Sequence, residues 1–149
     1  MTAVTAPRDD AGDPVRTLAG GPAAQLAGVE LVEARPGYAH ARMLVTPSLL
    51  NAYGLCHGGF VFLLADTAFG AAANAYGSIS LAAHAEIVYT SPAPPGVTLE
   101  AHATELVRYG DGNRNAIYDV QVTGGTGEVF AQFRGTIKVL RSPAGPTSS

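Results

Sequence analysis

The sequence predicts a single α+β domain in which a curved antiparallel sheet of about five or six strands wraps one long central helix. The first observation is the stretch from His57 to Ala75, which carries apolar residues on nearly every helical face and is typical of a buried helix. The second is a period-two alternation of apolar and polar residues in the flanking segments, which indicates half-buried strands. The third is the lack of long helical patterns between the later strands, which favours antiparallel pairing.

Composition sets the broad class of the protein. The 149 residues, 47% apolar and 14% charged, are the size of one globular domain. We expect a disordered leader over 1–16, the folded domain over 17–140 and a flexible tail over 141–149. A net charge of −3 with scattered cationic residues argues against nucleic acid as a partner. The single cysteine, Cys56, excludes an intrachain disulfide and suits a reducing compartment.

Neither a secretory signal nor a membrane span is predicted. Residues 1–14 carry charges but no apolar run. The longest apolar stretch, Phe60 to Tyr76, is interrupted by polar residues and is too short to cross a bilayer comfortably. We therefore expect a cytoplasmic protein without a membrane partner.

The segments before the central helix form a hairpin and a loop. Thr17–Ala27 contains three glycines and a proline, so at most a short, frayed helix is expected there. Gly28–Arg35 and Tyr38–Val45 flank the turn dipeptide Pro36-Gly37, which predicts a β-hairpin. An irregular loop from Asn51 to Gly59 then leads to the helix.

The central helix is predicted to span roughly His57 to Tyr76, with Gly77 as its C-terminal stop. Four strands follow, and we expect them to pair in sequence order as a meander. Turns are indicated at Pro92–Gly96, Gly110–Asn113 and Gly124–Gly127. The residues on one face of each strand are Leu81, Ala83, Ala85, Ile87 and Tyr89; Val97, Leu99, Ala101 and Ala103; Ala116, Tyr118, Val120 and Val122; and Ala131, Phe133, Ile137 and Val139.

Asp66 is the most informative residue, because it lies in the middle of the apolar helix with no lysine or arginine within two turns. Burying an unpaired carboxylate is costly, so such acids are often functional. The alternative is a structural role, in which Asp66 caps a neighbouring loop or hydrogen-bonds to Thr67 or Asn74.

The residues Cys56-His57-Gly58-Gly59 stand directly before the helix. A helix N-terminus presents unpaired N–H groups and partial positive charge, and glycine lets a ligand approach that backbone closely. This arrangement predicts an oxyanion site, although the two glycines could also serve only a tight turn.

Gly58 and Asp66 are eight residues apart, which is about 12 Å along one helix. One small reacting group cannot reach both, so we expect a site shared by two chains whose central helices lie antiparallel across a two-fold axis.

The residues from Asn51 to Phe69 also resemble a known family. Their pattern is similar to the signature of the PaaI-type acyl-CoA thioesterases of the hotdog-fold superfamily. The similarity continues more loosely through Val139 and includes Phe133-Arg134-Gly135. The matching residues are Asn51, Cys56, His57, Gly58, Gly59, Phe62, Leu64, Ala65, Asp66, Thr67, Ala68 and Phe69.

This resemblance implies a hotdog fold, a homodimer as the catalytic unit and, usually, a homotetramer. It also implies hydrolysis of phenylacetyl-CoA-like, aromatic or medium acyl-CoA thioesters. Asp66 takes the position of the general base or nucleophile, and Gly58 that of the N–H that polarises the carbonyl. His57 and Asn51 match polar positions around the reacting group. One carboxylate and one preorganised N–H donor suffice for a thioester, so we expect neither a metal nor another cofactor.

Four further residues are candidates for substrate binding. Gly59 and Thr67 adjoin the two catalytic candidates. Arg108 and Arg114 bracket the Gly110–Asn113 turn and could meet the phosphates of coenzyme A, although a solvated hairpin tip explains them equally well.

Other chemistries fit the residues less well. A Cys56–His57 thiol nucleophile lacks a third group to orient the histidine, and the four histidines lack the paired spacing of a zinc site. A hotdog dehydratase or hydratase would need a second His–acid pair that is not evident. A non-catalytic acyl-CoA binding protein remains open, because binding and hydrolysis use the same pocket, but an intact Asp66 argues against it.

Overall fold

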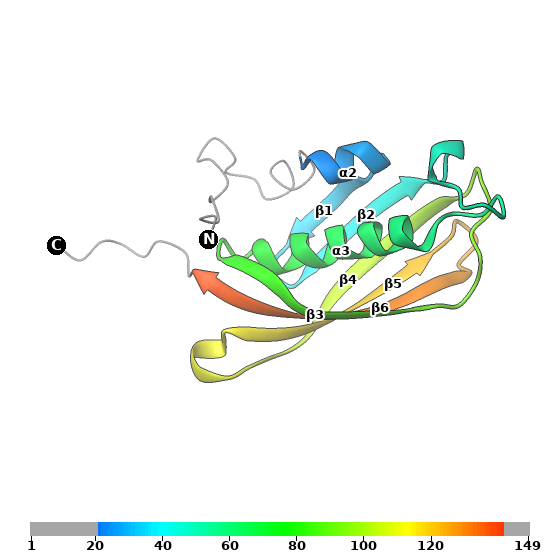
Figure 1. Cartoon of the computed structure of the whole chain (residues 1–149). Coiled ribbons are helices and arrows are strands. Elements are labelled where there is room, and N and C mark those ends of the chain that lie inside the picture. Colours follow the sequence, from blue (N-terminus) through cyan, green and yellow to red (C-terminus); the bar gives the residue numbers. More distant parts are fainter. Residues whose placement is uncertain (1–20, 142–149) are drawn as a thin grey trace.

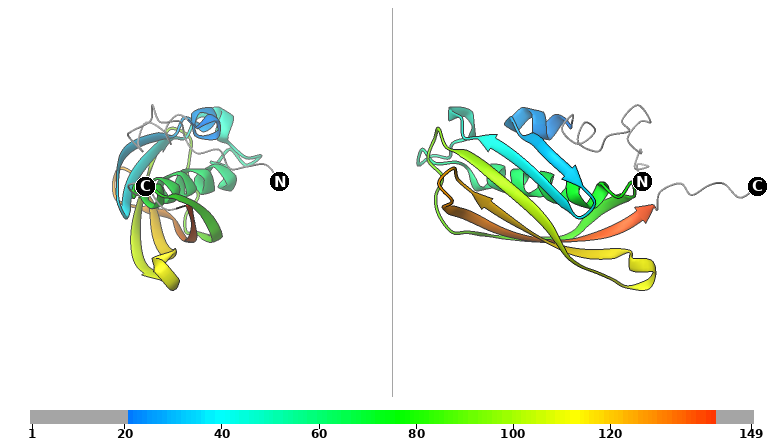
Figure 2. Two further views of the ribbon diagram at one scale, coloured as in Figure 1. Left: turned by 90° about the vertical axis from the view of Figure 1, so that its left-hand side faces the viewer. Right: turned by 180° about the vertical axis from the view of Figure 1, so that it is seen from behind.

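The computed structural model describes residues 21–141, in which a six-stranded antiparallel sheet curls around one long helix (Figure 1). Figure 2 shows that helix lying in the hollow of the sheet. The elements are α2 (Pro22–Ala27), β1 (Glu30–Arg35), β2 (Tyr38–Leu44), η1 (Pro47–Leu49), α3 (Gly58–Asn74), β3 (Ile79–Tyr89), β4 (Thr98–Tyr109), η2 (Asp111–Asn113), β5 (Asn115–Thr123) and β6 (Val129–Arg141). The α+β prediction is therefore confirmed. The predicted leader over 1–16 lies outside the described residues, and so does the predicted tail over 141–149 apart from Arg141, which is the last residue of β6.

The strand order is β1-β2-β4-β5-β6-β3. The predicted meander is confirmed for β4, β5 and β6, but it is wrong for β3, which pairs with β6 at the edge of the sheet. The connection over 90–97 carries the chain from this edge back to β4, which lies between β2 and β5. Alternation identifies a strand but holds no information about its partner, and this is why the sequence pattern misplaced β3.

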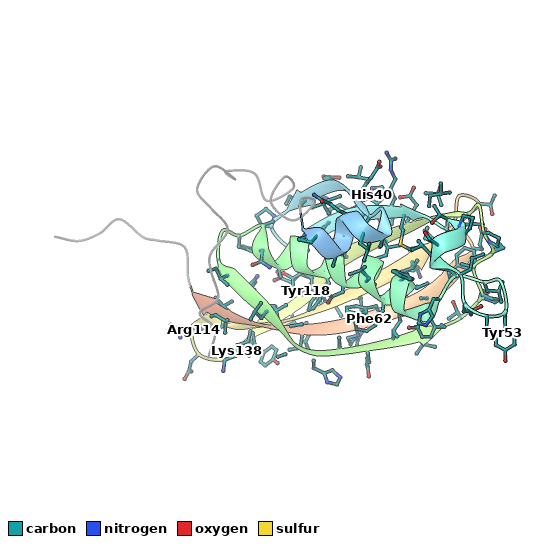
Figure 3. All side chains as sticks on the ribbon, turned by 45° about the horizontal axis from the view of Figure 1, so that its top comes forward. His40, Tyr53, Phe62, Arg114, Tyr118 and Lys138 are labelled. Atoms are coloured by element: carbon teal, nitrogen blue, oxygen red, sulfur yellow. The ribbon has the colours of Figure 1, made fainter. Side chains whose placement is uncertain are left out.

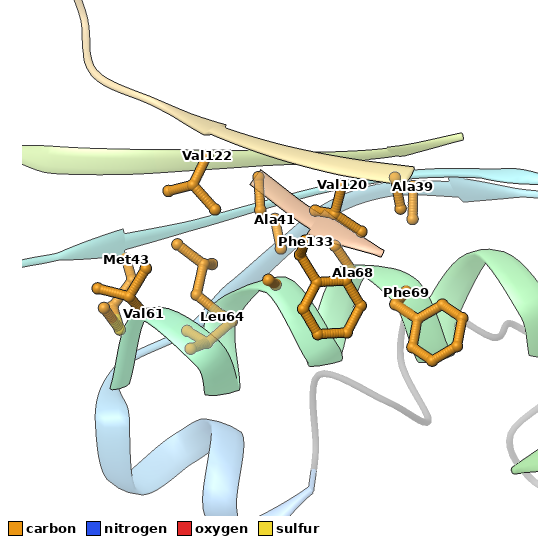
Figure 4. Close-up of a cluster of buried hydrophobic side chains, with 14 of the residues drawn as sticks. Ala39, Ala41, Met43, Val61, Leu64, Ala68, Phe69, Val120, Val122 and Phe133 are labelled. Carbon is orange, nitrogen blue, oxygen red and sulfur yellow. The ribbon is translucent and has the colours of Figure 1, made fainter. Parts of the chain in front are cut away.

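The apolar faces predicted for the last three strands point at α3. With the exception of Val97, the predicted residues of β4, β5 and β6 are at most 8% exposed. Figure 4 shows Leu64, Ala68 and Phe69 of the helix packed against side chains of the sheet, among them Met43, Val120, Val122 and Phe133. Small residues on β2 and β4 let the helix lie close to the sheet, since Ala39 and Ala101 are fully buried.

The face predicted for β3 is wrong over its first half. An extra residue at Ala83 interrupts the register with β6, and such a bulge moves all preceding side chains to the opposite face. Ala85 and Ile87 therefore pack against the core as predicted. Leu81 is instead 46% exposed, and Ser80 takes the buried position.

The helix α3 is slightly shorter than predicted. It ends at Asn74, whose side chain bonds the backbone N–H of Ser80 at 2.9 Å and so ties the helix end to β3. Gly77, the predicted stop, follows with a φ of +86°, a left-handed conformation that glycine adopts without steric cost. No helix among residues 21–141 is long and apolar enough to span a membrane.

One side of α3 is not covered by the sheet of its own chain. The residues on this open stripe, which are only partly buried, are Phe62, Leu63, Asp66, Thr67 and Gly70. The prediction that the helix is buried all round is therefore wrong for a single chain, because one curved sheet covers only part of a helical cylinder.

Candidate active site

Gly58 is the first residue of α3, and the turn that it begins has one unused donor. His57 caps the helix, and its Nδ1 accepts the N–H of Gly59 at 2.9 Å. The N–H groups of Phe60 and Val61 point to the carbonyl of His57 at 3.0 and 3.4 Å. Within the described part of the chain, the N–H of Gly58 has no hydrogen-bond partner. The helix N-terminus therefore offers the single backbone donor that an oxyanion needs.

Gly59 lies against the capping histidine. The sequence predicts that Gly59 contacts the substrate, but its N–H is already used by the imidazole of His57. An ideal Cβ on Gly59 would lie 3.0 Å from His57 Nδ1. The glycine at 59 thus serves the close approach of the capping histidine.

A cavity of about 340 Å³ opens beside Gly58. Its polar lining includes Asn51, Thr90 and Ser91, and its apolar wall includes Val61 and Phe130. This volume and this mixture of apolar walls with a few polar groups are typical of small-molecule sites.

Tyr89, the last residue of β3, also lines this cavity and was not predicted to be part of the site. Its hydroxyl donates to the carbonyl oxygen of Gly58 at 2.8 Å. Its ring lies against the glycine, since an ideal Cβ on Gly58 would be 2.9 Å from the ring carbon Cζ. No local pattern could have revealed this contact, because it joins two segments 31 residues apart.

Asn51 shapes the loop that precedes the helix. Its Oδ1 accepts the backbone N–H groups of Tyr53 at 2.9 Å and of Leu55 at 3.2 Å. The side chain therefore holds the turn that forms one wall of the cavity. Among the residues that the structure describes, nothing hydrogen-bonds to its Nδ2, so this donor is free to face a ligand.

Asp66 lies on the open stripe of α3 and makes neither a hydrogen bond nor an ion pair with any residue in 21–141. Burial raises the pKa of its carboxyl above the ordinary value. The structural alternatives find no support, because Thr67 Oγ1 donates to the carbonyl of Leu63 at 2.7 Å and the amide of Asn74 bonds backbone groups. An unpaired, partly desolvated carboxylate is suited to accept a proton or to attack an electrophile.

Asp66 is not among the residues that line the cavity beside Gly58. Both residues belong to α3, and their separation of eight residues corresponds to about 12 Å along the axis. A single chain therefore presents the donor and the acid at two different places.

Arg108 is held by contacts with Glu105 of its own strand and with Tyr76, which follows α3. Its guanidinium forms an ion pair with Glu105 and lies 4.0 Å from the ring centroid of Tyr76. Glu105 in turn accepts hydrogen bonds from the hydroxyls of Tyr76 at 2.8 Å and Tyr118 at 3.1 Å. Because these contacts engage the guanidinium group of Arg108, few of its N–H donors are left for the coenzyme A phosphates that the sequence predicted as its partner.

Arg114 is exposed at the hairpin between β4 and β5. Figure 3 shows it at the end of the molecule opposite Tyr53, which belongs to the loop beside Gly58. Within one chain, the structure thus brings Arg114 to neither Gly58 nor the cavity.

The alternative thiol and metal chemistries gain nothing from the geometry. Cys56 is buried, and this burial raises the pKa of its thiol, which disfavours the reactive thiolate. His40 pairs with Glu100 and stacks on His102 on the outer face of the sheet, away from α3. In residues 21–141, no group of three or more potential ligands is placed to hold a metal ion.

Three comparisons relate this chain to known proteins. The sequence profile of the family "Thioesterase superfamily" matches residues 53–130. The chain is 36% identical over 112 residues to the acyl-coenzyme A thioesterase PaaI of Escherichia coli strain K12, an alignment that covers 75% of this chain and 78% of the relative.

Solved structures agree with this relationship. The structure of the E. coli PaaI protein from the phenylacetic acid degradation operon superposes with a TM-score of 0.77 at 31% identity, covering 83% of this chain and 88% of the other. A mutant of the phenylacetic acid degradation protein PaaI from Thermus thermophilus superposes with a TM-score of 0.75 at 32% identity, covering 80% of this chain and 100% of the other.

Proposed function

Because this chain belongs to the thioesterase superfamily and has the hotdog fold of the PaaI-type acyl-CoA thioesterases, we propose that it hydrolyses acyl-CoA thioesters at a site shared by two copies of the chain. In this proposal the N–H of Gly58 polarises the thioester carbonyl, and Asp66 of the other copy supplies the carboxylate. The acyl group is phenylacetyl-like, aromatic or of medium length.

The observation that carries this proposal is the separation of donor and acid on one helix. The unpaired N–H of Gly58 adjoins a cavity that contains no carboxylate in its lining. The unpaired carboxylate of Asp66 lies on the open stripe of α3. Two α3 helices packed antiparallel along this stripe would bring each Asp66 toward the Gly58 of the other copy.

The edge of the sheet supports the same assembly. β3 pairs with β6 on one side only, so its other side presents unpaired backbone groups suited to a second strand. Val88 is 63% exposed and Leu81 46% exposed on this strand. A second copy of β3 would pair with this backbone edge and place its own side chains beside these apolar ones. We expect a homodimer in this arrangement, with a homotetramer as its further assembly.

The chemistry follows from these positions. The carbonyl oxygen of the thioester accepts the N–H of Gly58, so the negative charge of the tetrahedral intermediate develops at the helix N-terminus. Asp66, acting as general base, takes a proton from water while the hydroxide adds to the carbonyl carbon. The C–S bond then breaks, and the proton passes to the thiolate, which yields the free acid and coenzyme A. If Asp66 attacks directly, the C–S bond breaks and coenzyme A leaves as its thiolate, which gives a mixed anhydride that water hydrolyses in a second step.

The lining of the cavity supports an acyl-CoA substrate. Leu55, Val61 and Phe130 provide apolar surface, while Asn51 and Ser91 provide polar groups at its edge. Its volume of about 340 Å³ is sufficient for a small ring or a medium acyl chain.

Release of free thiol from a panel of acyl-CoA substrates tests this function. The panel contains phenylacetyl-CoA, hexanoyl-CoA and crotonyl-CoA, and thiol is measured with a chromogenic disulfide. We expect thiol release from the first two. Binding of acyl-CoA without release would favour a binding protein, and loss of the crotonyl double bond without release would favour a hydratase.

A further inference from the structure

Two hydrogen bonds connect Tyr89 to His57 through a single peptide group. The hydroxyl of Tyr89 donates to the carbonyl oxygen of Gly58 at 2.8 Å. On the other side of the same peptide bond, the N–H of Gly59 donates to His57 Nδ1 at 2.9 Å. A peptide group is planar, and hydrogen bonds in a chain polarise one another. The position of the tyrosine hydroxyl therefore bears on the orientation of both the glycine and the imidazole.

The ring of Tyr89 also explains why residue 58 is glycine. An ideal Cβ at this position would lie 2.9 Å from Cζ and 3.2 Å from Cε1 of the tyrosine. Gly58 is helical and does not have a positive φ, so its backbone conformation alone would admit other residues. A side chain at position 58 would therefore have to push the ring of Tyr89 away from its present place.

The sheet places the tyrosine firmly. Tyr89 pairs with Ala131 of β6 at the end of β3. The next residue, Thr90, anchors the strand end, with its N–H bonded to the carbonyl of Phe130 at 2.9 Å and its hydroxyl to that of Val129 at 2.9 Å. Partial burial raises the pKa of Tyr89, which keeps its hydroxyl in the protonated, donating form.

We propose that Tyr89 is a positioning residue for the oxyanion site, because its hydroxyl and ring hold the first turn of α3 so that the N–H of Gly58 faces the cavity. This inference rests on the proposed function, in which that N–H polarises the thioester carbonyl. The same hydrogen-bond chain selects a tautomer of His57. Since Nδ1 accepts the N–H of Gly59, the neutral ring carries its proton on Nε2.

The substitution Tyr89→Phe removes the hydroxyl and keeps the ring. Loss of one hydrogen bond of ordinary strength predicts a decrease in kcat of about five- to ten-fold, while KM stays within about two-fold of the original value. Tyr89→Ala also removes the ring and is expected to lower kcat further. Tyr109→Phe is the matched control, because Tyr109 is similarly exposed and its hydroxyl makes no hydrogen bond within the described residues. This control is expected to keep both constants.

A second measurement does not depend on turnover. The nitrogen chemical shifts of the His57 ring, assigned by their loss in His57→Gln, report which nitrogen carries the proton. We expect the Nε2–H tautomer in the original protein and a shift toward the Nδ1–H form in Tyr89→Phe. A merely structural tyrosine would leave these signals unchanged.

Both results together are required to support the proposal. An unchanged kcat in Tyr89→Phe overturns it, and so does a lower kcat with unmoved His57 signals. If the original protein releases no thiol from any acyl-CoA, the proposed function fails instead. The nitrogen shifts would still show whether Tyr89 governs His57.

Discussion

The ring of Phe69 occupies the place where a side chain on Gly135 would have to lie. An ideal Cβ on Gly135 would be 2.6 Å from Cζ of Phe69 and 2.8 Å from its Cε1. Gly135 lies on the inward face of β6, between the buried residues Phe133 and Ile137 of the same strand. The absence of a side chain at this position lets the middle of α3 rest on the sheet.

Gly135→Ala is therefore expected to destabilise the protein by about 1–3 kcal/mol, because the buried ring must leave its rotamer or the helix must move. Thermal unfolding followed by circular dichroism measures the change. Gly125→Ala is the matched control, since nothing lies within 4 Å of a Cβ there, and its effect should stay within about 0.5 kcal/mol. Equal melting temperatures for Gly135→Ala and the original protein would contradict the packing described for Phe69.

The sequence predicted the helix and the strands of this fold better than it predicted which strands pair with one another. The period-two faces of β4, β5 and β6 are local patterns, and the structure confirms them. The pairing of β3 with β6 and the bulge at Ala83 depend on the curvature of the whole sheet. No alternation within eleven residues contains that information.

In the candidate site, too, local sequence features could be predicted, whereas contacts between distant segments could not. The helix N-terminus at Gly58 and the lone acid at Asp66 were predicted because each departs from its local surroundings. Tyr89 was missed, because as the last residue of a strand it looks like any half-buried aromatic. Arg108 was proposed to bind the coenzyme A phosphates because it brackets a hairpin turn and a guanidinium suits phosphate oxygens, whereas Glu105 and Tyr76 hold that guanidinium in the structure. The cytoplasmic location and the tetramer stay predictions.

Asp66→Asn is expected to lower kcat by about 10²–10⁴, the usual contribution of a general base. The amide has nearly the shape of the carboxylate but neither takes a proton nor attacks a carbonyl. Asp111→Asn is the control, since Asp111 is exposed at the hairpin between β4 and β5, and it should keep full activity. Turnover of Asp66→Asn near that of the original protein would assign Asp66 a structural role.

The raised pKa of Asp66 predicts how stability depends on pH. Burial favours the protonated form in the folded state, so the folded chain binds this proton more tightly than the unfolded chain does. The ionised carboxylate therefore destabilises the fold at neutral pH, and this penalty is relieved as the pH falls through the raised pKa toward the ordinary value of 3.8. Asp66→Asn should thus be more stable than the original protein at pH 7.

Denaturant unfolding of the two proteins from neutral to acidic pH checks this sign. The stability advantage of Asp66→Asn should shrink as the pH falls and should vanish below the ordinary aspartate pKa. An Asp66→Asn protein that is less stable than the original at neutral pH would show that the carboxylate has a stabilising partner in the assembled protein.

The shared site makes a distinctive prediction for mixed dimers of two inactive variants. Asp66→Ala removes the acid. Gly58→Val places a Cβ 2.9 Å from the ring of Tyr89, which must displace the tyrosine or the first turn of α3. Valine at position 58 keeps the backbone N–H but blocks the helix entrance beside it, so each chain retains a working part of the site that the other lacks. If donor and acid come from different copies, one of the two sites in a mixed dimer combines the intact Gly58 of the Asp66→Ala chain with the intact Asp66 of the Gly58→Val chain.

Such mixed dimers, isolated with two different affinity tags, should therefore regain about half of the original activity per dimer, provided that the sites act independently. Each variant alone should remain inactive, since every site in its homodimer carries a lesion. The Gly58→Val chain must first be shown to dimerise by its mass in solution, because a folding defect would also give an inactive mixture. A properly assembled mixed dimer without activity would mean that one chain supplies both groups, and the inference drawn from their separation of about 12 Å along α3 would be wrong.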